Sequence, residues 1–227
     1  MALHTDRQYE EELQQLRAKI LEMGGLVEKQ IDDAIIALTE RNSDQAHEVI
    51  ERDHVVNYFD VAVNEACTRL LALHQPAASD LRLIMTGLKI STDLERIGDI
   101  AQNICERALE LNQEPPFKHA VDLPRMADWA RSMLRDSLDA FVREDTELAL
   151  HVCQRDDFID DLTAQIFHEM FAYMAQDPQS VSRATAFLFL AKYLERIADH
   201  ATNIAEMVIY MVKGKSIRHI SPPPATI

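Results

Sequence analysis

Glycine is scarce in this sequence, and its scarcity argues against a protein built of β-strands. Only five glycines occur among 227 residues. Sheet proteins need many tight turns, and glycine is favoured in turns because it adopts left-handed backbone conformations without strain. Residues that favour helices repeat with helical periodicity almost from end to end. We therefore predict an all-α protein with long helices and few turns.

Cysteine pairs and long apolar runs are also missing. Cys67, Cys105 and Cys153 stand far apart, which argues against both a disulfide framework and a zinc site. We interpret them as small buried apolar residues in a reducing compartment. The N-terminus lacks the features of a signal peptide, and no stretch approaches the roughly 18 apolar residues of a membrane span. We expect a cytoplasmic protein without a transmembrane segment. This expectation is compatible with peripheral association at a membrane.

Basic residues are outnumbered by acidic ones, 23 to 38, which gives a formal net charge of -15. Such a field repels nucleic acid and anionic lipid and attracts cations. The same charge is typical of a surface that keeps a protein soluble. The composition therefore argues against a nucleic-acid partner and leaves cation binding open.

The few turn signals divide the chain into six long helices. Asn42 is suited to cap a helix, and Asp177-Pro178 is typical of a helix start. Gly214 is a natural C-terminal cap. We expect the first helix to be loosened at Gly24-Gly25. The expected helices span residues 6–41, 44–74, 78–112, 122–142, 144–176 and 178–213.

A proline-containing segment around Pro115-Pro116 is the only convincing interior linker. It predicts a first three-helix bundle over residues 1–113, a linker over 114–121 and a second bundle over 122–214. Residues 215–227 are expected to form a flexible tail, which contains a disordered proline run at 221–224.

The two halves of the chain repeat one another. Leu94-Glu95-Arg96-Ile97-Gly98-Asp99 recurs 100 residues later as Leu194-Glu195-Arg196-Ile197-Ala198-Asp199. Apolar residues at spacings of three and four in both segments predict a buried helix face. The simplest architecture is two tandem, pseudo-symmetric three-helix bundles.

Beside each apolar seam lies a polar stripe with Glu and Asp four residues apart. Such carboxylates share a helix face and repel each other unless positive charge lies between them. Counting from the turns near Gln75 and Asp177 places further aspartates of the preceding helix level with them. Carboxylates suit magnesium, manganese and iron ions. The predicted metal ligands are Asp53, Glu95, Asp99, Asp156, Asp160, Glu195 and Asp199.

Two other interpretations of these carboxylates are a solvated face and simple salt bridges, such as Asp99 with Arg96. In either case the protein would be a scaffold without metal. The two copies also differ, because Asn57 stands where the second half has Asp160. Asparagine brings no charge, so we expect the second site to hold metal more tightly.

An enzymatic alternative is a carboxylate-bridged di-iron helical-bundle enzyme. Such a centre needs two Glu-x-x-His motifs. The sequence has Glu51-x-x-His54, with no counterpart in the second half. We therefore predict a protein that is not an enzyme and assign no catalytic residue.

Several segments together resemble the PhoU family, the accessory regulators of bacterial phosphate-specific transport. The resemblance spans residues 9–213. Besides the two Leu-Glu-Arg-Ile-x-Asp copies, it rests on Met23-Gly24-Gly25-Leu26-Val27-Glu28, Gln75-Pro76-Ala77-Ala78-Ser79-Asp80-Leu81-Arg82 and Glu206-Met207-Val208-Ile209-Tyr210. It implies two three-helix bundles with multinuclear metal sites on the paired motifs, with iron in some members.

The resemblance also implies a role. The chain would restrain phosphate uptake and phosphate-starvation signalling, linking a phosphate-specific ABC transporter to a phosphate-sensing histidine kinase. It implies a homodimer as well. The metal, whether iron, manganese or magnesium, is left open.

Overall fold

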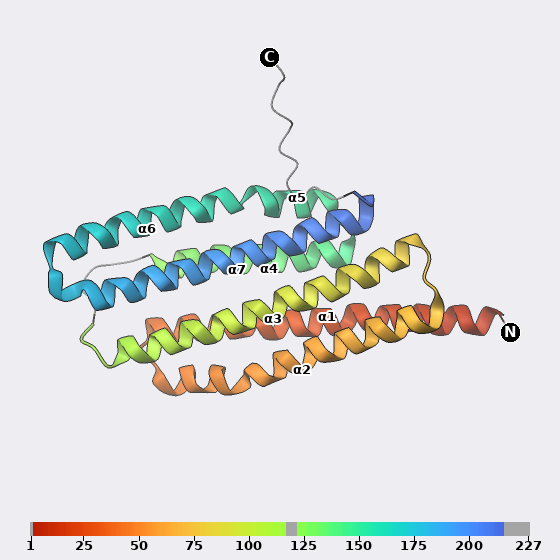
Figure 1. The fold of residues 1–227 in the computed structure, drawn as a ribbon, viewed down its shortest axis with the longest axis horizontal. Helices are drawn as coiled ribbons and strands as arrows, with labels where there is room; N and C mark the ends of the chain where they lie inside the picture. The colour runs from red at the N-terminus through yellow and green to blue at the C-terminus, as the bar shows by residue number, and fades with distance from the viewer. Residues whose placement is uncertain (1, 117–121, 216–227) are drawn as a thin grey trace, which may run out of the picture.

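The chain folds into two helical bundles that lie side by side. The computed structural model describes residues 2–116 and 122–215, which contain helices and no strand. All the long helices run along the same axis of the molecule (Figure 1). The first bundle comprises α1 (Ala2–Thr39), α2 (Ser43–His74) and α3 (Ala78–Asn112). The second comprises α4 (Leu123–Arg143), α5 (Thr146–Gln154), α6 (Asp156–Gln176), the 3-10 turn η1 (Pro178–Ser180) and α7 (Val181–Lys213).

This architecture confirms the predicted all-α class and the two tandem bundles. Part of the predicted linker, residues 117–121, lies outside the described residues. So do residues 216–227, which hold most of the predicted tail and its proline run.

The duplication extends to the backbone of the turns. Arg41 and Glu144 both adopt the left-handed conformation, with φ of 55° and 53°. Each is followed by a residue that caps the next helix, Asn42 for α2 and Asp145 for α5. The capping side chains accept hydrogen bonds from backbone N–H groups that have no partner within the helix. Each bundle thus turns from its first helix into its second in the same way.

The expected loosening of the first helix is wrong, because α1 continues unbroken through Gly24-Gly25. Gly24 is buried where α1 packs against α4. A Cβ atom at Gly24 would lie 2.5 Å from Cδ1 of Leu138, whereas one at Gly25 would meet nothing within 4 Å. Gly24 therefore permits a close contact between the bundles rather than a break in the helix.

The predicted helix over 144–176 is divided at Arg155 into α5 and α6. The N–H of Arg155 donates to the carbonyl of Val152, three residues back, instead of four. Its guanidinium lies 2.5 Å from a carboxylate oxygen of Asp136 on α4. The new helix then begins with Asp156 and Asp157, where free N–H groups favour negative charge.

The core is built from the predicted apolar seams of α3 and α7, whose members are buried. Cys67 and Cys105 are buried as predicted, whereas Cys153 is only partly buried, and all three are free thiols. One continuous apolar cluster joins both bundles. None of the described helices combines the length and apolar character needed to cross a membrane.

The bundles contact each other through α1 against α4 and α3 against α7. Ion pairs and a histidine–aspartate contact cross this interface. Arg131 of α4 lies 2.6 Å from Asp32 of α1, and His200 of α7 lies 2.8 Å from Asp93 of α3. The contact between Asp93 and His200 lies where α3 packs against α7, the two helices that carry the repeated Glu and Asp.

Candidate functional site

In the second bundle all four predicted carboxylates, Asp156 and Asp160 on α6 and Glu195 and Asp199 on α7, lie within electrostatic reach of one another. Partial burial raises the pKa of Asp199, and the charges of Asp156, Glu195 and Asp160 raise it further. Burial likewise raises the pKa of Asp156, with added repulsion from Asp160 and Glu195. The four side chains thus form a single electrostatic cluster, which we call the second carboxylate cluster.

Two partners offset part of this repulsion. Lys192 pairs with Oε1 of Glu195 within α7. The hydroxyl of Thr202 donates to Oδ1 of Asp156, with 3.2 Å between the oxygens. Oε2 of Glu195 is buried and has no hydrogen-bond partner. The cluster therefore contains more negative charge than its protein partners balance.

The first bundle gathers Asp53 of α2 with Glu95 and Asp99 of α3, the first carboxylate cluster. Asp53 is only 8% exposed. Burial raises the pKa of Asp53, and the charge of Asp99 raises it further. Burial, then the charge of Asp99, also raises the pKa of Glu95, with a further contribution from Asp60. Asp60 of α2, which is not among the predicted ligands, completes the acidic surroundings.

Within the first cluster, Asn57 serves as a hydrogen-bond donor. Its Nδ2 lies 2.9 Å from Oδ2 of Asp53. Arg96 contacts both neighbouring carboxylates, at 3.3 Å from Glu95 and 3.2 Å from Asp99. The salt bridge considered as an alternative to metal is thus present. It is weak, because the Arg96 side chain is 55% exposed and solvent screens the pair.

The donor chemistry of both clusters fits a hard cation. Within residues 2–116 and 122–215, no three His, Cys, Asp or Glu side chains converge closely enough to enclose a metal ion. Carboxylate oxygens are instead spread along facing helices. Oδ1 of Asp53 and Oε2 of Glu195 are both buried without a partner. Unpaired carboxylate oxygens in a partly desolvated site are costly, and a bound cation offsets that cost.

Two other polar residues at these sites were missed by the sequence reasoning. Thr202 follows Asp199 by three residues and contacts Asp156. Gln30 of α1 is only 6% exposed, and its Oε1 has no hydrogen-bond partner. A signal for Gln30 existed, because it lies three residues after buried Val27 and four before buried Ala34, on the apolar face of α1.

The structure gives no geometric support to the di-iron alternative at His54. This residue is exposed, and its Nδ1 lies 2.6 Å from the carbonyl oxygen of Glu51. The ring nitrogen therefore faces the helix backbone.

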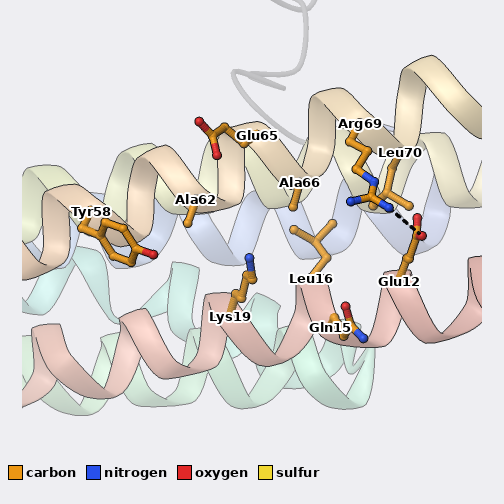
Figure 2. A pocket seen from close by; sticks show the side chains of 10 residues that line it. All are labelled: Glu12, Gln15, Leu16, Lys19, Tyr58, Ala62, Glu65, Ala66, Arg69 and Leu70. Carbon is orange, nitrogen blue, oxygen red and sulfur yellow. Dashed lines mark hydrogen bonds and ion pairs between the residues drawn. The ribbon is translucent and has the colours of Figure 1, made fainter.

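A separate hollow lies between α1 and α2 and contains none of the predicted ligands (Figure 2). Arg69 and Glu12 form an ion pair across it, with 3.5 Å between Nη2 and Oε1. Lys19 extends from α1 toward α2 in the same hollow. The charges of this hollow are mixed and partly paired, whereas acidic groups predominate in the two carboxylate clusters.

Comparison with known proteins identifies relatives of this chain. A family model described as the PhoU domain matches residues 20–108 and 123–208, one segment in each bundle. The phosphate-specific transport system accessory protein PhoU homolog of Pseudomonas putida is 45% identical over 218 residues, covering 96% of this chain and 85% of the relative. The corresponding PhoU protein of Escherichia coli K12 is 40% identical over 217 residues, covering 96% and 90%.

Solved structures show the same fold. The crystal structure of PhoU from Pseudomonas aeruginosa superposes with a TM-score of 0.88 at 42% identity, covering 91% of this chain and 100% of that chain. The phosphate transport system regulatory protein PhoU from Streptococcus pneumoniae gives a TM-score of 0.86 at 31% identity, covering 92% and 99%. Both likenesses extend over the two bundles.

Proposed function

The chain belongs to the PhoU family, and we propose on this basis that it is a negative regulator of phosphate uptake and phosphate-starvation signalling. The match covers both bundles and nearly the full length of its relatives. Those relatives are named as accessory or regulatory proteins of phosphate transport. The proposed partners are a phosphate-specific ABC transporter and a phosphate-sensing histidine kinase, with the chain acting between them. We further propose a homodimer, which light scattering tests.

The observation that supports a specific mechanism is the pair of carboxylate clusters. Both contain carboxyl groups whose pKa is raised by burial and by their neighbours. We propose that each cluster binds a divalent or trivalent cation, with iron, manganese and magnesium as candidates. The cation would supply positive charge and would take part in no catalytic reaction. The proposed ligands are Asp53, Glu95 and Asp99 in the first bundle and Asp156, Asp160, Glu195 and Asp199 in the second.

In this proposal a bound cation links carboxylates on two neighbouring helices, which otherwise repel each other at these positions. Asp156 and Asp160 would be tied to α7, and Asp53 would be tied to α3. The proposed ligands lie at matching heights on neighbouring helices, which brings them to one site. Their partial burial excludes part of the water from that site. A neutralised cluster also changes the charge of the surface offered to a partner. Metal would therefore serve structure or docking, consistent with a regulator that catalyses no reaction.

Genetic complementation tests the regulatory role. A strain lacking this gene should express phosphate-starvation genes even in high phosphate, and the wild-type chain should restore repression. The double variant Asp156→Asn/Asp199→Asn should restore it poorly. The matched control Asp139→Asn/Glu147→Gln, which alters carboxylates outside both clusters, should restore it fully. Normal repression in the strain without the gene would refute the assignment.

The enzymatic alternative has its own test. Purified protein loaded with ferrous iron is exposed to oxygen, and oxygen consumption is followed over many equivalents. A purely regulatory protein consumes no more oxygen than its bound ferrous iron can reduce. Sustained turnover would contradict the proposal that the chain is not an enzyme.

A further inference from the structure

Two buried oxygen atoms face one small space beside Gly98 in the first bundle. A methyl group at Gly98 would lie 3.2 Å from Oε1 of Gln30 and 3.4 Å from Oδ1 of Asp53. Gln30 is 6% exposed and Asp53 is 8% exposed. Neither of these two oxygens has a hydrogen-bond partner. Because both atoms are acceptors, their burial together is unfavourable unless they share a donor or a cation.

The hydrogen bonding of Asp53 explains why its Oδ1 has no partner. Its Oδ2 accepts a hydrogen bond from Asn57 on the same helix. Its Oδ1 points to the space beside Gly98, where the carbonyl oxygen of Gln30 is the neighbouring acceptor. The neutral amide of α1 and the carboxylate of α2 are thus directed to the same point next to α3.

At the position that corresponds to Gln30, the first helix of the second bundle carries no side-chain oxygen. The same offset of 103 residues relates Asn42 to Asp145, and it also relates the Asp33–Arg52 ion pair to the Asp136–Arg155 ion pair. Applied to Gln30, this offset leads to Met133, which is fully buried.

The third helices differ at the matching position as well. They are related by the offset of 100 residues, so Gly98 corresponds to Ala198. The first bundle therefore has an amide oxygen and a glycine where the second has a thioether and a methyl group.

We propose that Gln30 is a further ligand of the first bundle's cation and binds it through Oε1 alongside Asp53. This inference rests on the proposed metal sites and extends the first of them to α1. Amide oxygens are ordinary ligands of hard cations and add no charge. The first site would draw oxygens from three helices, and the second from two. The first site is then a different site rather than a weakened copy of the second.

A purely structural role for Gln30 predicts different behaviour. If its amide is turned so that Nε2 donates to Oδ1 of Asp53, the pair is satisfied without a cation. Replacing Gln30 would then destabilise the metal-free protein and leave metal affinity unchanged. The metal-ligand role predicts the reverse on both counts.

The experiment uses the full chain with Mn²⁺ as the probe. In the background Asp156→Asn/Asp199→Asn, which disables the second site, Gln30→Met places the side chain of the second bundle in the first. Gln30→Glu retains an oxygen at the same reach. We expect Gln30→Met to weaken Mn²⁺ binding by roughly tenfold or more, as measured by calorimetric titration and paramagnetic resonance. Gln30→Glu should retain binding. The melting temperature of metal-free Gln30→Met should stay at or above that of its parent.

Three outcomes would overturn the inference in distinguishable ways. Unchanged Mn²⁺ affinity together with a lower metal-free melting temperature would establish the hydrogen-bonding role of Gln30. If the background binds no Mn²⁺ while the wild type binds it, the first site does not exist, and the proposed second site stands. If the wild type itself binds no metal, the proposed metal sites fail along with this inference.

Discussion

The hydroxyl of Thr202 on α7 donates a hydrogen bond to Asp156 on α6, with 3.2 Å between Oγ1 and Oδ1. This contact lowers the pKa of Asp156, but burial and the neighbouring carboxylates outweigh it, and the pKa is raised. At neutral pH the second carboxylate cluster therefore opposes the packing of α6 on α7. The free energy of unfolding should respond to any change that removes this charge.

Asp156→Asn should stabilise the metal-free protein. Asparagine keeps an oxygen that accepts from Thr202 and removes a charge that repels Asp199. Because the site is partly exposed and screened by solvent, and because asparagine lacks the favourable interaction of a negative charge with the start of α6, the net gain at pH 7 should be small, below about 0.5 kcal/mol. Chemical unfolding in the presence of a chelator measures it. Asp139→Asn is the control, and a loss of stability in Asp156→Asn beyond that of the control would contradict the account.

The advantage of Asp156→Asn should shrink as the pH falls. The raised pKa of Asp156 and Asp199 means that the folded state binds protons before the unfolded state does, whose carboxyl groups titrate near the ordinary value of 3.8. Between the folded-state pKa and that ordinary value, acidification favours the folded wild type and relieves the repulsion. Unfolding curves of both proteins at a series of pH values below 7 measure the difference. A difference that grows on acidification would show that the pKa shift has the opposite sign.

Much of the fold could be predicted because its determinants are local in the sequence. Asn42 and Gly214 were identified from their residue types, and the seams of α3 and α7 from their periodicity. The break at Arg155 could not be predicted, since no glycine or proline marks it in the sequence. The role of Gly24 was also hidden. Its contact partner, Leu138, lies in the other bundle.

The candidate site was predictable to the same degree. The facing carboxylates followed from helix geometry, because the rise per residue is equal in two antiparallel helices. Gln30 and Thr202 could not be assigned, since their relation to the clusters depends on how the side chains pack. Asn57, which stands where the second half has Asp160, donates a hydrogen bond from its amide to Asp53, a contact that the sequence does not reveal.

The two adjacent glycines of α1 should respond differently to alanine. Gly25→Ala should stabilise the protein by about 0.5–1 kcal/mol, because a helix favours alanine and the new methyl group meets nothing within 4 Å. Gly24→Ala should gain less or lose stability, because its methyl group would displace Leu138 of α4. Thermal and chemical unfolding of the two variants measure the difference. Equal stabilisation by both would show that the bundles do not pack closely at Gly24.

Gly98→Ala should weaken the first cation site without unfolding the bundle. The methyl group would occupy the space between Gln30 and Asp53 and would also lie 3.3 Å from Cγ1 of Val56. Helix preference for alanine contributes about 0.5–1 kcal/mol in the favourable direction, which offsets these tight contacts. Metal-free stability should therefore change by less than about 1 kcal/mol, while Mn²⁺ binding in the first bundle falls. Unchanged Mn²⁺ binding would show that the space is not part of the site.

Metal content and metal-dependent melting of the full chain test the central claim most directly. Wild-type protein purified without chelator should carry bound metal by elemental analysis, and its melting temperature should rise on metal addition. Free metal at one hundred times the dissociation constant should raise the free energy of unfolding by about 2.7 kcal/mol per site. The double variant Glu195→Ala/Asp199→Ala should lose the metal of the second cluster and part of the rise in melting temperature. A wild type without bound metal, with cation-dependent melting identical in the variant, would contradict the account.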